Sequence, residues 1–114
     1  MSNLISVAGD AFTSEVLAAD VPVLVEFVAS WCGPCRVQKP LLVELARETA
    51  GRCKVCVVDV EVNPAIAVRY RVHSAPTLMV FRRGEPVALR VGLTRLPALR
   101  EMLDLGARPA ATRA

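Results

Sequence analysis

The chain has 114 residues, of which 54% are hydrophobic and 22% are charged, and this balance predicts one globular domain and excludes a disordered chain. Its longest apolar run, 21–29, is interrupted by a proline and a glutamate and is shorter than the roughly 18 residues of a membrane-spanning helix, so we expect no membrane segment. The net charge is +3, but the basic residues are scattered and aromatic residues are few, which argues against a nucleic-acid partner.

The chain is acidic up to Arg36, its first basic residue, because four acidic residues and no Lys or Arg precede it. Secretory signal peptides begin with a basic segment, and organellar transit peptides are rich in arginine and poor in acids. We therefore expect a cytoplasmic protein.

Apolar runs and helical periodicity alternate along the first half of the chain. Residues 4–7 predict a short strand, and Asp10 is a candidate N-cap for a helix over 10–19. Residues 22–29 form a nearly continuous apolar run, which is typical of a strand buried on both faces of a parallel sheet. A longer helix is predicted over 32–50, because its apolar residues recur at helical spacing.

A third strand is predicted over 55–60, again from a continuous apolar run. Asn63 and Pro64 then mark the N-cap and the first position of a helix that ends near Arg71. These elements repeat the alternation of strand and helix seen earlier in the chain.

The last part of the chain predicts a hairpin followed by a helix. Strands over 77–81 and 87–91 flank the turn signal Arg83-Gly84. A final helix is expected over 94–105, with Thr94 as its N-cap.

The resulting order, βαβαβαββα, predicts an α/β fold. Helical crossovers join parallel strands, and the final hairpin adds antiparallel ones. We expect a mixed central sheet with helices on both faces, in one domain over 1–107 that is followed by a flexible C-terminal tail over 108–114.

The motif Trp31-Cys32-Gly33-Pro34-Cys35 lies where the second predicted strand meets the second predicted helix. The N-terminus of a helix carries unpaired N–H groups and a partial positive charge, which favour a thiolate. Cysteines three residues apart at the start of a helix are also close enough to form a disulfide. The motif therefore predicts a reactive dithiol rather than two buried structural cysteines.

The four cysteines also fit a zinc-ribbon template, because Cys53 and Cys56 repeat the same spacing after seventeen residues. Two features argue against zinc: the intervening stretch has the periodicity of a full amphipathic helix, and residues three apart on a strand point to opposite faces. We expect no metal site, and we expect this second pair of cysteines to be dispensable.

Several spaced stretches resemble bacterial thioredoxins over most of the chain, from about residue 4 to residue 105. They are Leu24-Val25-Glu26-Phe27, the motif at 31–35 with Pro40, Asn63-Pro64, Ala75-Pro76-Thr77-Leu78, Phe81 with Gly84, and Val91-Gly92. The resemblance implies a thioredoxin fold and a protein-disulfide reductase that binds no cofactor and receives electrons from NADPH through thioredoxin reductase. Its partners would be that reductase and disulfide-containing substrate proteins, and we expect a monomer.

The resemblance also implies roles for individual residues. Cys32 would be the nucleophile that forms a mixed disulfide with the substrate, and Cys35 would resolve it. Pro76 resembles the family's cis-proline, which faces the dithiol, and Ala75 would offer its backbone groups to an extended substrate segment. We call the expected apolar set around the nucleophile the docking surface; its members are Trp31, Gly33, Pro34, Ala75, Pro76, Gly92 and Leu93.

Four positions depart from the family pattern. Glu26 replaces the usual buried aspartate, Val28 a common tryptophan, Val57 a lysine often found near the acid, and Ala75 the usual isoleucine or valine. Because Glu26 lies in the middle of an apolar strand, we expect burial to raise its pKa. We also expect this carboxylate to take the proton from Cys35 during resolution.

Two alternatives concern other roles. His73, the only histidine, lies in the predicted loop before Pro76, and we interpret it as a surface residue rather than a catalytic one. A thioredoxin-fold subunit that works only by binding, as a processivity or scaffold factor, is the other alternative; the intact dithiol favours redox chemistry instead.

Overall fold

A computed structural model describes residues 4–107, so the predicted tail at 108–114 lies outside the described residues. Its elements, in chain order, are β1 (Leu4–Ser6), the π-helix η1 (Thr13–Leu17), β2 (Val23–Val28), α1 (Gly33–Glu48), β3 (Lys54–Asp59), α2 (Pro64–Arg69), β4 (Thr77–Arg82), β5 (Glu85–Val91) and α3 (Leu96–Ala107). Within this described range, the helices are too short or too polar to cross a membrane.

The strands form one mixed sheet in the order β1-β3-β2-β4-β5. β1 and β2 both pair parallel with β3, whereas β4 pairs antiparallel with β2 and β5 antiparallel with β4. Helical connections permit parallel neighbours, and the β4–β5 hairpin requires an antiparallel pair. The predicted mixed α/β sheet is therefore confirmed.

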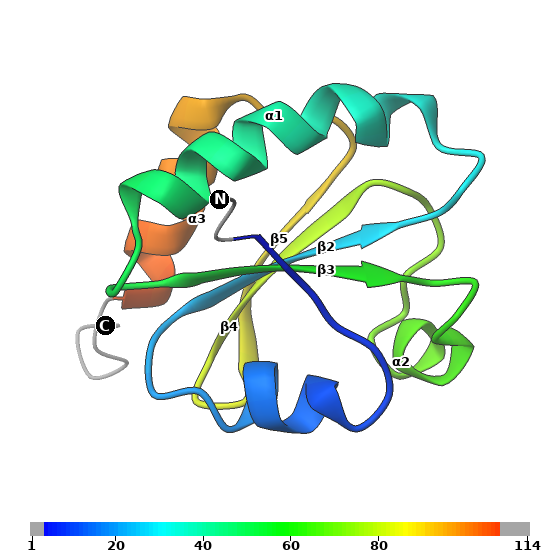
Figure 1. The fold of residues 1–114 in the computed structure, drawn as a ribbon, viewed down its shortest axis with the longest axis horizontal. Coiled ribbons are helices and arrows are strands. Elements are labelled where there is room, and N and C mark those ends of the chain that lie inside the picture. The colour runs from blue at the N-terminus through cyan, green and yellow to red at the C-terminus, as the bar shows by residue number, and fades with distance from the viewer. Residues whose placement is uncertain (1–3, 108–114) are drawn as a thin grey trace.

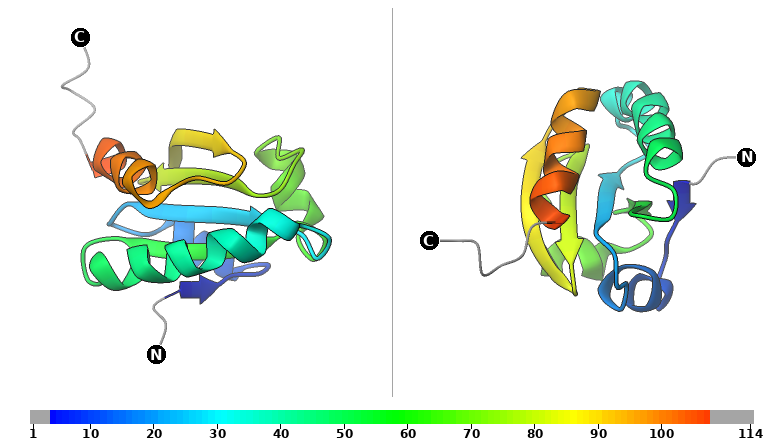
Figure 2. Two further views of the ribbon diagram at one scale, coloured as in Figure 1. Left: turned by 90° about the horizontal axis from the view of Figure 1, so that it is seen from above. Right: turned by 90° about the vertical axis from the view of Figure 1, so that its left-hand side faces the viewer.

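Helices cover both faces of the sheet, as predicted. Figures 1 and 2 show α1 and α3 on one face, and η1 with α2 on the other. The α1–α3 face buries Leu24 of β2 against Leu42 of α1 and Leu99 of α3. The opposite face buries Phe27 of the same strand with Phe12.

Alternation along β2 decides where its one charged residue lies. Successive side chains of a strand point to opposite faces. Leu24 faces α1, and Val25 and Phe27 belong to the opposite core. Glu26 therefore lies on the α1 side, close to the end of β2 from which the chain leads into α1.

The first helix differs from its prediction over 10–19. The regular helix is replaced by η1, a single π-helical segment that ends with the bond from Ala18 N to Thr13 O. Asp10 provides a backbone carbonyl to Thr13 N there. Phe12 and Val16 are buried against the sheet, and their packing decides this segment more than helix propensity does.

Asn63 is the N-cap of α2 and Pro64 is its first residue, as predicted, whereas the prediction of Thr94 as the N-cap of α3 is wrong. The side chain of Asn63 makes no cap hydrogen bond to α2 and instead accepts from Gly9 N at 2.9 Å and donates to Asp59 O at 3.0 Å. Thr94 lies two residues before α3, which begins at Leu96. The Oδ1 of Asn63 and the backbone of Thr94 bind residues distant in the sequence, so rules based on local sequence do not predict these contacts.

The hairpin turn is the tight form that its sequence predicts. Arg83 and Gly84 both have positive φ, 50° and 81°, as a two-residue turn with matching strand twist requires. β5 consequently starts at Glu85, two residues before the predicted Val87, with a register shift between Val80 and Phe81.

Candidate active site

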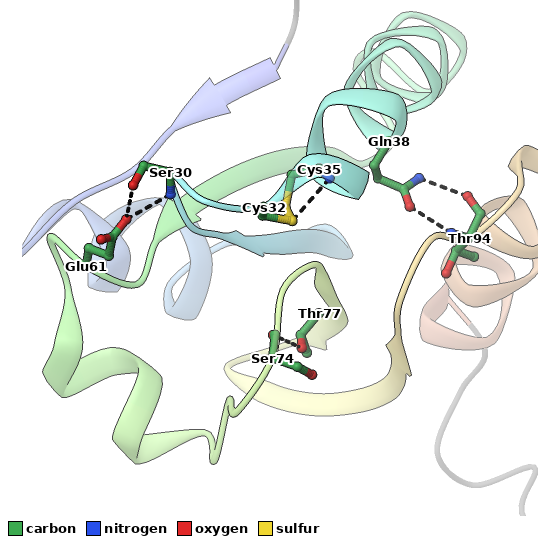
Figure 3. Close-up of a disulfide and its surroundings, with 8 residues drawn as sticks. All are labelled: Ser30, Cys32, Cys35, Gln38, Glu61, Ser74, Thr77 and Thr94. Carbon is green, nitrogen blue, oxygen red and sulfur yellow. Dashed lines mark hydrogen bonds between the residues drawn. A yellow bond between two sulfur atoms is a disulfide. The ribbon is translucent and has the colours of Figure 1, made fainter.

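The two cysteines of the motif form a disulfide at the start of α1. Cys32 is the N-cap of the helix, in an extended conformation, and its Sγ accepts from Cys35 N at 3.1 Å (Figure 3). Gly33 and Pro34 occupy the first turn, where a proline removes no helical hydrogen bond. The predicted pairing of these cysteines is confirmed, and the N–H group that faces Cys32 Sγ would stabilise a thiolate there.

Segments distant in the sequence surround this disulfide. Ala75 packs against the small cluster formed by Ala29, Cys32 and Cys35. The Ala75–Pro76 peptide bond is cis, as the resemblance implied. Trp31, which precedes the first cysteine, is 68% exposed.

The third segment follows β5. Gly92 N donates to Pro76 O at 2.8 Å, which brings the segment next to the cis-proline. Leu93 is 51% exposed. Thr77 Oγ1 donates to Ser74 O at 2.6 Å and closes the turn on the other side of the proline. The 92–93 segment and the cis-proline are thus adjacent; their role in substrate binding remains a prediction.

Glu26 is buried near the disulfide, as expected. It is 2% exposed, and its Oε2 has no hydrogen-bond partner. It lines a pocket of about 460 Å³ together with both cysteines of the disulfide. Burial raises the pKa of this carboxyl to about 7, so its protonation changes near neutral pH.

The small side chains of Val28 and Val57 also line this pocket. Arg36 and Lys39 of α1 line the pocket too, but the shift in the pKa of Glu26 comes from burial. Sequence reasoning missed these two residues as neighbours of the buried acid. Arg36 directly follows Cys35 and Lys39 lies one helical turn after it, and this spacing was the available signal.

A second carboxylate holds the loop that leads into the motif. Glu61 Oε1 accepts from Ser30 N at 2.8 Å and from Ser30 Oγ at 2.7 Å (Figure 3). These hydrogen bonds lower the pKa of Glu61. The sequence carried no signal for this contact, because the two residues are distant along the chain and come from different connections.

The other two cysteines lie on opposite faces of the sheet, as predicted. Cys56 of β3 is fully buried in the core on the η1–α2 face of the sheet, and burial raises the pKa of its thiol to about 11. Cys53 is half-buried on the α1–α3 side, and burial raises the pKa of its thiol as well.

No three His, Cys, Asp or Glu residues come together as a metal site within 4–107. His73 is an exposed loop residue, as interpreted.

A disulfide between cysteines three residues apart, at a helix N-terminus beside a cis-proline, defines a thiol–disulfide oxidoreductase. The thioredoxin family model matches residues 3–104. Thioredoxin 1 of Nostoc sp. is 42% identical over 104 residues, which cover 91% of this chain and 97% of that protein. The thioredoxin of Mycobacterium bovis is 43% identical over 105 residues, with 91% and 90% covered. This chain therefore belongs to the thioredoxin family.

A solved structure agrees with this assignment. A mutant thioredoxin from Halobacterium salinarum NRC-1 matches with a TM-score of 0.83 and 34% identity, over 94% of this chain and 93% of that one. The predicted thioredoxin fold is confirmed. With its Cys32–Cys35 disulfide, the chain is a protein-disulfide reductase of this family.

Proposed function

We propose that Cys32 attacks the substrate disulfide and that Cys35 resolves the mixed disulfide. The observation that carries this assignment is the N-cap position of Cys32, whose Sγ accepts from Cys35 N. Both cysteines are buried to a similar degree, so exposure does not distinguish them. The helix N-terminus does, because it stabilises negative charge on the sulfur that caps it.

The reaction moves two electrons from the reduced dithiol to the substrate. The Cys32 thiolate bonds to one substrate sulfur, the substrate S–S bond breaks, and the first substrate thiolate leaves and is protonated. Cys35, after losing its proton, attacks Cys32 Sγ; the Cys32–Cys35 bond forms, the mixed disulfide breaks, and the second substrate thiolate leaves and is protonated. The disulfide in the structure corresponds to the oxidised product.

Glu26 is the base that accepts the Cys35 proton in this proposal. Its carboxyl lines the same pocket as Cys35 and has an unpartnered, buried Oε2. Its pKa of about 7 suits a group that must gain and lose a proton near neutral pH. A water molecule in the pocket would complete the path if the two groups do not meet directly.

We further propose that the protein acts as a monomer in the cytoplasm, with electrons from NADPH delivered by thioredoxin reductase. Two free thiols, Cys53 and Cys56, accompany the redox-active pair. Free thiols persist best in a reducing compartment. The substrates are disulfide-containing proteins that dock an extended segment beside Ala75.

The proposed roles are tested by coupled turnover of insulin with NADPH and a thioredoxin reductase. Cys32→Ser should abolish turnover with the fold intact. Cys35→Ser should leave a reactive Cys32 that accumulates mixed disulfides, visible on non-reducing gels. Turnover by the Cys32 variant, or a reactive Cys32 that traps no substrate in the Cys35 variant, would contradict the assignment.

A further inference from the structure

A buried glutamine joins the start of α1 to the segment that follows β5. Gln38 lies one turn after Cys35 and is 0% exposed. Its Nε2 donates to Thr94 O at 2.8 Å, and Thr94 N donates to its Oε1 at 2.7 Å (Figure 3). A buried amide without partners is costly, so both bonds favour one position of the Thr94 backbone relative to α1.

These two hydrogen bonds bind the backbone of a residue that lies beyond the end of β5, where pairing with β4 has stopped. Thr94 lies three residues beyond Val91, the last residue of β5. A strand residue in an antiparallel ladder exchanges an N–H and a carbonyl with a single partner. The Gln38 amide makes the same exchange with Thr94, so this residue outside the sheet has a hydrogen-bond partner for both its N–H and its carbonyl.

From Thr94 the hydrogen bonds continue to the cis-proline. Thr94 Oγ1 donates to Gly92 O at 3.0 Å, and Gly92 N donates to Pro76 O at 2.8 Å. Gly92 has a φ of 94°, a conformation that favours glycine. One connected set of hydrogen bonds thus links α1 to the cis-proline through residues 92–94.

We propose that Gln38 is a positioning residue for protein substrates: by binding Thr94, it holds Gly92 and Leu93 of the docking surface at a set position relative to Cys32. This inference rests on the proposed function, since it assumes that substrates contact that surface. A segment that is already ordered loses less conformational entropy when a polypeptide binds it. Gln38 itself takes no part in the thiol exchange, so its effect is on binding and not on the reactivity of the dithiol.

The test compares a protein disulfide with a small one in two variants of Gln38. Gln38→Leu is similar in size and makes neither bond, whereas Gln38→Glu in its ionised form keeps an acceptor for Thr94 N and loses the donor to Thr94 O. For Gln38→Leu we expect the KM for insulin to rise about fivefold to tenfold, because residues 92–94 must then be ordered when the substrate binds, with kcat nearly unchanged. Reduction of dithiobis-nitrobenzoate, which has no polypeptide to dock, should change less than about twofold. Gln38→Glu should give an intermediate KM.

Leu42→Val is the matched control, because Leu42 is fully buried one turn further along the same helix. It should lower stability and leave the KM for insulin unchanged. Hydrogen exchange at Thr94 N should accelerate in Gln38→Leu and not in Leu42→Val.

An unchanged KM for insulin in Gln38→Leu, or an equal slowing of both disulfides, would overturn the positioning role. If Gln38→Leu does not fold, the same measurements on Gln38→Glu decide the question. Failure of the proposed function has a different signature, because the unmodified protein would then not reduce insulin through Cys32.

Discussion

At the scale of single residues, Glu26 combines a structural cost with a chemical use. Its carboxyl is buried in a central strand with one oxygen unpartnered, which penalises the ionised form. The pKa is therefore raised from 4.5 to about 7. Between these values the folded protein keeps a proton that the unfolded chain has lost, so stability must fall as pH rises through this window and stay level above it.

Glu26→Gln should remove this pH dependence. At pH 8 the oxidised variant should be more stable than the unmodified protein by roughly 3 kcal/mol, the free energy that corresponds to the raised pKa. Below about pH 4.5 the two proteins should differ little, because the glutamate is then neutral in both folded and unfolded states. Denaturant unfolding of the oxidised proteins across this pH range measures the difference.

The same variant should slow the release of substrate by Cys35 near neutral pH, because glutamine cannot accept a proton. Stopped-flow measurement of mixed-disulfide resolution from pH 6 to 8 gives this rate. An unchanged rate would reduce Glu26 to a structural residue, whatever its effect on stability.

Cys53 and Cys56 illustrate thiols that burial keeps unreactive. Burial raises the pKa of both, so neither forms much thiolate at neutral pH. Changing both to alanine should retain most of the insulin reductase activity and cost about 1 kcal/mol of stability, mainly from the lost packing of Cys56. Activity and denaturant midpoints test this, and loss of a bound zinc ion together with the fold on chelation would instead support the zinc-ribbon interpretation.

At the scale of elements, the β4–β5 turn depends on a glycine for two reasons. Gly84 has a φ of 81°, and a Cβ there would lie 3.2 Å from the carbonyl oxygen of Leu17 in η1. Gly51, which follows α1, has a similar φ of 85° with nothing within 4 Å of such a Cβ. Both glycines therefore have a positive φ, but only at Gly84 would an added Cβ come close to another residue.

Gly51→Ala should cost about 1 kcal/mol, from the left-handed backbone alone. Gly84→Ala should cost about 2 kcal/mol or more, because Leu17 must also move. Urea unfolding of the two variants gives the comparison. Equal losses would show that η1 shifts freely and that the contact with the turn is unimportant.

At the scale of the whole molecule, the strand order of the sheet places some strands between two layers of helices and leaves β5 at an exposed edge. β2 lies at the centre with helices over both faces, and Leu24 is fully buried. β5 is an edge strand, and Leu89 is 59% exposed, on the face that carries η1 and α2 over the other strands. Residues of one type therefore have different energetic roles according to strand position.

Leu24→Ala should cost about 2–5 kcal/mol, because it leaves a cavity between α1 and the sheet. Leu89→Ala should stay within about 0.5 kcal/mol of the unmodified protein, because its side chain already contacts water. Thermal and denaturant unfolding of the pair test the difference, and a comparable loss at Leu89 would mean that the exposed face of β5 is covered in solution.

Much of this protein follows from its sequence alone. The apolar runs at 22–29 and 55–60 gave strands within one or two residues of those observed, because a strand buried on both faces needs continuous apolar residues. The dithiol was equally clear, since its spacing and its place before a helix are local properties. Glu26 was identified as buried because it interrupts one of these runs.

Only the tertiary structure decided the contacts between distant segments. The partners of Asn63 and Thr94, the Ser30–Glu61 bond and the Gln38 amide bonds join residues that are far apart in the sequence. The same is true of the pocket that places Arg36 and Lys39 with Glu26. Local patterns report which residues prefer burial, a helix or a strand, because those preferences act within a few positions. A polar group is bound by whichever partner the packed chain brings within hydrogen-bond distance, and the packing of the whole chain determines that partner.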